Sequence, residues 1–153
     1  MSAVADAQVG GVSSTRLAKG RYGGAGQLAG GFSLGNTRDA EHFGPGADLR
    51  LKATEDITQV GIGPHAYWLH SSWTTPYARV GATLLELGRV DGATSIGSLG
   101  PRAEFGVFLS TFVISAFAEY DLRWSDQDNE GFFGLMLGKG FGISTEAPLP
   151  PGE

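Results

Sequence analysis

The sequence predicts an all-β fold, and more specifically an eight-stranded antiparallel up-and-down β-barrel. Three observations support this fold class. Polarity alternates from residue to residue in segments of about ten residues, which is the period of a strand. Clusters of Gly, Asp, Asn and Pro separate these segments, as turns separate strands. The 153 residues include 25 glycines, and no long segment spaces its apolar residues as a helix does.

The segment from Glu104 to Trp124, EFGVFLSTFVISAFAEYDLRW, shows the alternation most plainly. Only fourteen uncharged residues separate Glu104 from Glu119, fewer than the roughly 18 that mark a membrane-spanning helix. A buried helix is also disfavoured, because Gly106 interrupts the run and several β-branched residues follow it. We therefore predict two strands that form a hairpin and turn near residues 110–112.

The other predicted strands are joined by recognisable turns. Glu55-Asp56 and Asp91-Gly92 are short turns, and Asp-Gly is a strong hairpin signal. The polar stretch 36–46 is the longest internal connection. Besides the two strands of the hairpin, we predict strands at 12–19, 27–35, 47–54, 59–70, 77–89 and 132–143.

Closure into a barrel follows from the number and the length of these strands. Eight antiparallel strands in sequence order leave no open edge when the first pairs with the last. A two-sheet sandwich is the alternative. Strands of about nine to twelve residues are longer than the common five or six, and they match a tilted membrane crossing. Strand length therefore favours the barrel.

The chain is predicted to be one domain with two terminal segments. We expect a flexible N-terminal segment at 1–10, the barrel domain at 11–144 and a Pro-rich C-terminal tail at 145–153. No basic and apolar signal-peptide regions open the chain, so it is expected to be the mature form of an exported protein. The net charge of −5 and the scattered Lys and Arg residues argue against a nucleic-acid partner.

Alternation gives two faces, and the residues on them indicate which one is outside. One face is apolar, whereas the other carries small residues and charges of both signs on adjacent strands. A narrow lumen requires small residues and paired charges, although an ordinary solvated face is the alternative. We predict a lumen charge network of Arg102, Glu104, Glu119, Asp121 and Arg123. The lipid-facing set is Phe105, Val107, Leu109, Ile114, Leu122 and Trp124.

The closing strands, AEFGVFLSTFVISAFAEYDLRW and GFFGLMLGKGFGI, resemble those of small bacterial outer-membrane β-barrels such as the OmpA transmembrane domain and OmpX. The resemblance rests on alternation and on aromatic residues near strand ends, such as Trp68, Trp73, Tyr77, Tyr120 and Trp124. It implies an eight-stranded barrel in the outer membrane, with lipid as its partner and short turns at one rim.

Two short motifs could carry chemistry. His70 and Ser72 have the H-x-S spacing found in outer-membrane lipid A deacylases, a likeness that implies His70 as base, Ser72 as nucleophile and Glu86 as the orienting acid. Residues 126–131, DQDNEG, resemble half of an EF-hand loop but lack its bidentate Glu. We expect a solvated acidic loop there, no metal site, no cofactor and no enzymatic activity.

The sequence therefore predicts a structural or interaction protein of the bacterial outer membrane, with a lumen filled by side chains and a place in a larger assembly. A protein partner or a second copy of the chain would then hold the C-terminal tail. The alternatives are a soluble barrel or sandwich that binds an apolar ligand or serves as an assembly subunit, and a lipid-directed hydrolase that uses His70 and Ser72.

Overall fold

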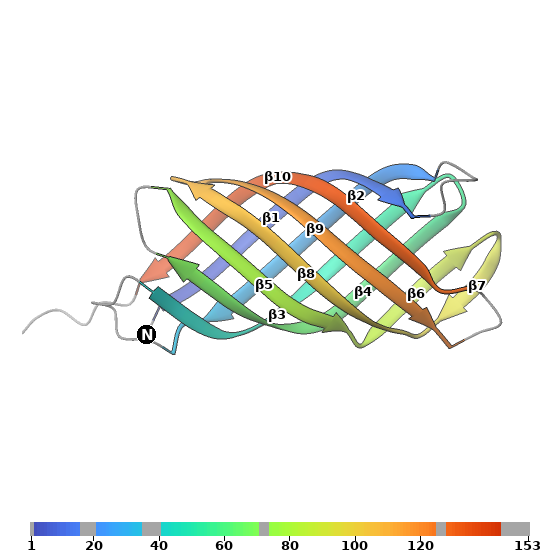
Figure 1. Ribbon diagram of the computed structural model, residues 1–153, viewed down its shortest axis with the longest axis horizontal. Helices are drawn as coiled ribbons and strands as arrows, with labels where there is room; N and C mark the ends of the chain where they lie inside the picture. Colours follow the sequence, from blue (N-terminus) through green and yellow to red (C-terminus); the bar gives the residue numbers. More distant parts are fainter. Residues whose placement is uncertain (1, 16–20, 35–40, 71–73, 125–127, 145–153) are drawn as a thin grey trace, which may run out of the picture.

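A computed structural model describes residues 2–15, 21–34, 41–70, 74–124 and 128–144 of the chain. Most of these residues are in strands, which form one closed antiparallel sheet (Figure 1). The described residues include no helix long and apolar enough to span a membrane. The strands are β1 (Ser2–Ser14), β2 (Tyr22–Phe32), β3 (Glu41–Thr54), β4 (Ile57–His70), β5 (Thr75–Thr83), β6 (Leu85–Val90), β7 (Ala93–Ile96), β8 (Ser98–Leu109), β9 (Phe112–Arg123) and β10 (Glu130–Ser144).

These ten segments make eight barrel strands. β4 pairs with β5 along its second half and with β6 along its first half, so β5 and β6 are one barrel strand interrupted at Leu84. β7 pairs with β6, and β8 pairs with β5, so β7 and β8 are likewise one strand, interrupted at Gly97. Gly97 has a φ of 82°, which a residue with a side chain adopts only at a cost. β1 pairs with both β2 and β10 and closes the eight-stranded antiparallel barrel.

The predicted flexible segment at 1–10 is wrong, because β1 begins at Ser2. Residues 2–14 pair with β10 on one side, and residues 3–13 pair with β2 on the other. A barrel without this strand would leave β2 and β10 with open edges, so the alanines and glycines of the segment are held by the ladder. The barrel therefore starts at residue 2 rather than 11, while residues 145–153 lie outside the described part of the chain.

The predicted connection at 36–46 is too long, because its second half belongs to β3. Glu41–Gly46 pair with His65–His70 of β4. The glycines that suggest a loop lie at the crowded lumen wall. A Cβ atom on Gly44 would collide with the backbone of Phe32, and one on Gly46 would collide with the His65 ring. Glycine is needed here for close packing inside a strand.

The predicted turns lie where the sequence places them. Asp91 and Gly92 both have positive φ angles, 51° and 79°, as the two central residues of a type I′ hairpin turn require. Ser110, with a φ of 60°, begins the turn between β8 and β9. Glu55 and Asp56 join β3 to β4. The turns fix the register, and the register decides which residues face inward.

The barrel interior holds apolar side chains as well as polar ones. Two apolar clusters line it. Along β4, Ile57 belongs to one cluster and Tyr67 and Leu69 belong to the other, and the buried polar residues Gln59 and His65 lie between them. Two interior cavities, one beside Arg79 and Phe108 and one beside Lys52 and Phe117, have volumes of about 10 Å³ each. Each is about large enough for one water molecule. Side chains therefore fill these parts of the lumen.

Candidate functional site: the charged lumen

Among the described residues, thirteen charged ones are buried inside the barrel, seven acidic and six basic. They come from β1, β3, β5, β6, β8, β9 and β10 and from Arg21 just before β2. They are Asp6, Asp48, Glu86, Glu104, Glu119, Asp121, Glu130, Arg21, Arg50, Lys52, Arg79, Arg102 and Arg123. A buried charge is costly unless it is paired, so these groups must satisfy one another.

The five residues of the predicted lumen charge network are all buried and lie in this interior set. Arg102 binds two carboxylates, with Nη1 3.0 Å from Oδ2 of Asp48 and Nη2 2.9 Å from Oε2 of Glu104. The register places Arg102 opposite Glu119. Arg123 binds Glu130 through Nη1 at 3.2 Å. Within the predicted set, Arg102 thus pairs with Glu104, and Arg123 lies 4.0 Å from Asp121. The other ion pairs of these five residues are with residues outside the set.

A second group joins β1 to the opposite side of the barrel. Arg79 pairs with Asp6 and with Oε1 of Glu104, the latter at 3.2 Å. Gln8 links these groups, because its Nε2 donates to Oδ1 of Asp6 at 2.7 Å and to Oε1 of Glu104 at 3.0 Å. The Tyr77 hydroxyl also donates to Glu104, at 2.6 Å. Glu104 therefore accepts hydrogen bonds from side chains of both β1 and β5.

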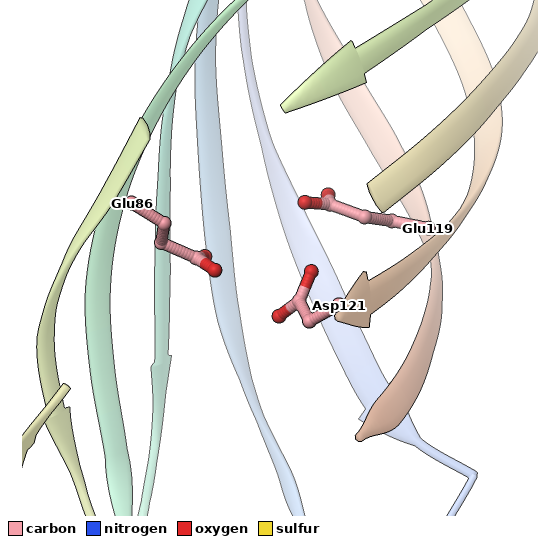
Figure 2. A group of neighbouring side chains, drawn as sticks. All are labelled: Glu86, Glu119 and Asp121. Atoms are coloured by element: carbon pink, nitrogen blue, oxygen red, sulfur yellow. The ribbon is translucent and has the colours of Figure 1, made fainter. Parts of the chain in front are cut away.

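Figure 2 shows three neighbouring acids, Glu86 from β6 and Glu119 and Asp121 from β9. All three contact the same lysine, Lys52. Nζ of Lys52 lies 2.8 Å from Oε1 of Glu86, 3.4 Å from Oε1 of Glu119 and 2.7 Å from Oδ2 of Asp121. Oxygen atoms of the three acids lie within 4.8 Å of one another, close enough to hold a metal ion. The Lys52 ammonium lies among them and supplies a positive charge from within the chain.

The predicted lumen charge network omits Asp48, Arg50 and Lys52, although their alternation places them on one face of the strand at 47–54. These three alternate with Leu49 and Leu51 along β3, in the same way as the charges of β9 alternate with apolar residues. Asp6, Arg79 and Glu86 stand singly among apolar or small residues. Their partners lie on strands far away in the sequence, so no local pattern predicts them.

The outward face has the opposite composition. Of the six predicted lipid-facing residues, five are exposed, and Val107 is half-buried. The exposed fraction is 64% for both Phe105 and Trp124. Along β9, exposure alternates with burial at every residue from Phe112 to Arg123. Apolar side chains therefore cover the outside of the hairpin.

Aromatic residues lie outside near the two rims, with one exception to the prediction. Phe43 and Trp68 are paired near one end of β3 and β4, whereas Tyr120 and Trp124 lie near the other rim on β9. Tyr77 was expected to join such a group but faces the lumen and is only 1% exposed. Its hydroxyl needs a polar partner when buried, and Glu104 provides one. Trp73 lies outside the described residues.

Glu86 lies too far from His70 to orient it, so this part of the likeness to lipid A deacylases is wrong. Glu86 pairs in register with Gly61, nine residues from His70 along β4, which corresponds to about 30 Å of strand. Glu86 instead contacts Lys52 inside the barrel. His70 stacks on Trp68, with 6.3 Å between the ring centroids. Ser72, Asp126 and Gln127 lie outside the described residues.

Solved structures share this architecture. The barrel superimposes on the outer membrane enzyme PagL with a TM-score of 0.59 and 14% identity, covering 92% of this chain and 99% of PagL. Neisserial surface protein A (NspA) gives a TM-score of 0.53 and 18% identity over 93% of this chain and 95% of NspA. The chain has the fold of a small outer-membrane barrel. Neither protein-family models nor curated protein sequences give a match.

Proposed function

We propose that the protein resides in a bacterial outer membrane as a structural or interaction barrel, with lipid around it and its lumen packed by side chains. The observation that supports this most strongly is the separation of charge. Thirteen charged residues of the described chain are inside, whereas its exposed charges lie in turns or near strand ends, with one exception. Those in turns or near strand ends are Glu41, Glu55, Asp56, Arg89, Asp91 and Asp128. The exception is Lys139, which lies within β10 opposite Phe112, the first residue of β9.

This arrangement fits hydrocarbon on the outside. The charge-free band lies on strands that mostly have 11 to 15 residues, enough for the roughly 9–11 residues that a tilted crossing requires. Closure leaves no backbone edge to face lipid. A soluble barrel of the lipocalin kind needs the reverse, an apolar cavity and a charged exterior. The described faces do not have that distribution, and the membrane proposal is the better supported.

An interaction role fits the packed lumen. The described interior charges are engaged with one another, and the two interior cavities beside Arg79 and Lys52 hold about one water molecule each. A transported solute would need to displace this network. The rims and the lipid-facing surface are the parts left for contact with another protein, and the C-terminal tail at 145–153 is our candidate for that contact.

Spin labels test the membrane proposal. We expect labels at Phe105, Ile114 and Leu122, in barrels refolded into lipid vesicles, to collide with oxygen and to be shielded from a water-soluble nickel reagent. A label at Asp91, in the exposed turn, serves as the aqueous control. Equal nickel accessibility at all four positions would leave the apolar face in water and contradict the proposal. Extraction of the native protein without detergent would contradict it independently.

A further inference from the structure

Glu86 and Asp121 share Lys52 as their nearest cation. Glu119, the third acid around Lys52, has a second partner, because Nη1 of Arg50 lies 2.5 Å from its Oε2. Glu86 has only Lys52 at ion-pair distance among the described residues. Asp121 has Lys52 at 2.7 Å, and its other cation, Arg123, is 4.0 Å away. Among the described residues, the Lys52 ammonium is therefore the one cation closer than 4.0 Å to either acid.

The second oxygen of each of these acids has no hydrogen-bond partner in the described chain. Oε2 of Glu86 and Oδ1 of Asp121 are both fully enclosed, in residues that are 2% and 0% exposed. An ionised carboxylate oxygen in such a place is unfavourable unless a cation or donor meets it. These two oxygens are thus available as ligands.

The register brings a neutral oxygen to the neighbouring strand β4. The side chain of Gln59 is 1% exposed, and neither its Oε1 nor its Nε2 has a partner among the described residues. Gln59 pairs in register with Lys52 on one neighbouring strand. On the other neighbouring strand its partner is Gly88, so Glu86 is its diagonal neighbour. An amide and two carboxylates with free oxygens therefore face the same part of the lumen.

The described interior holds more acids than bases. Seven acidic and six basic residues are buried among the described residues. His65 carries a positive charge only when it is protonated, and its Nδ1 lies 3.1 Å from Oδ2 of Asp48. Asp48 already pairs with Arg50 and Arg102. A charge on His65 would therefore act on Asp48, and not on Glu86 or Asp121.

We propose that Glu86, Asp121 and Gln59 bind one small monovalent cation such as Na⁺ next to the Lys52 ammonium. Carboxylate and amide oxygens are ligands for hard cations. One added positive charge gives Glu86 and Asp121 a second cation at contact distance, whereas a divalent ion would place two positive charges beside Lys52. The cation would also give the enclosed oxygens of Glu86 and Asp121 a partner.

Cation-dependent stability tests this site. Urea unfolding of the vesicle-embedded barrel is measured in NaCl and in N-methylglucamine chloride at equal ionic strength and pH, because the organic cation is too large for this lumen. We expect a higher unfolding midpoint in NaCl for the native chain. Asp121→Asn and Gln59→Leu should each abolish that difference. Asp91→Asn, a change to an exposed acid in the turn at the rim, should retain it.

Three outcomes would overturn the proposal. Equal midpoints in the two salts for the native chain would show that the lumen does not select a cation. Loss of the difference in Asp91→Asn would place binding at the rim. A midpoint that changes with pH but not with the cation would mean that a proton neutralises the two acids. Gln59→Leu keeps the test valid if Asp121→Asn does not fold, and the spin-label result is independent of all three.

Discussion

Arg102 shows what a single residue contributes to this barrel. Its guanidinium is 5% exposed and binds Asp48 from β3 and Glu104 from its own strand. Removing one member of a buried ion pair leaves the other charge buried and unpaired. The resulting loss of stability is larger than the stability that the intact pair contributes. The side chain therefore stabilises the barrel chiefly by neutralising two acids that have no route to water.

We expect Arg102→Ala to lower the free energy of unfolding by about 3–5 kcal/mol, the cost of leaving a buried charge unpaired. Glu119→Ala should have an effect of the same order, because it leaves Arg50 and Lys52 with one acid fewer. Arg89→Ala is the control: within the described chain this exposed arginine bonds to the Gly92 carbonyl alone, and its loss should cost about 0–1 kcal/mol. Urea unfolding in vesicles measures all three. Similar small losses in every variant would mean that the lumen is hydrated enough to screen these charges.

At this scale the sequence predicts a residue's face better than its partner. Alternation alone indicates that Arg102, Glu104 and Glu119 share the inward face. It does not reveal that Gln8 reaches Glu104, because 96 positions separate the two residues and a strand pattern contains only local information. Tyr77 is a related case. A tyrosine near a strand end can face outward at the rim or inward to the lumen, and the sequence does not show the hydroxyl partner that decides between the two.

At the scale of strands and turns, residues with positive φ angles fix the register. The turn of the β6–β7 hairpin needs Asp91 and Gly92 in the left-handed region, and a Cβ atom on Gly92 would meet no neighbouring atom within 4 Å. The sequence predicts this turn because Asp-Gly strongly favours the positive φ angles of a type I′ hairpin turn. It does not predict the interruptions at Leu84 and Gly97, where the curvature of the closed barrel sets the backbone.

We expect Gly92→Val to lower the free energy of unfolding by about 1–2 kcal/mol, the cost of holding a side-chain residue in the left-handed region. Steric contact should add nothing, since the space around Gly92 is open. Ala93→Val, at the next position, is the matched control and should change the stability little. Comparable losses in the two variants would show that the hairpin responds to bulk rather than to backbone conformation.

For the whole molecule, closure depends on the pairing of the first and last strands. β1 and β10 pair from Ser2↔Ser144 to Ser14↔Phe132. The sequence predicts eight strands and an up-and-down order, because the turns are short. It misses residues 2–10 as part of the barrel, since alanine and glycine have weak strand preferences and only the ladder on both sides holds them.

We expect deletion of residues 146–153 to leave the β structure and the unfolding midpoint unchanged, because the β1–β10 ladder ends before them. If a neighbouring protein or a second copy binds this tail, the native size of the assembly should decrease. Truncation after Gly140 is the control, because it removes Phe141 and the residues paired with Ser2–Ala5 and should weaken closure. Circular dichroism and native-size measurement separate the two effects. Loss of β structure on the shorter deletion would mean that the tail packs against the barrel.

The contacts of Arg79 with Asp6 and of Ser14 with Glu130 join residues 73 and 116 positions apart. Such pairs form late, because the intervening chain must be ordered first. If hairpins entered the bilayer one at a time, each would carry unpaired charges through hydrocarbon, at a high cost. Insertion and closure should therefore happen together, in a single slow step. The electrostatics of the lumen thus sets the timing of assembly as well as the stability of its product.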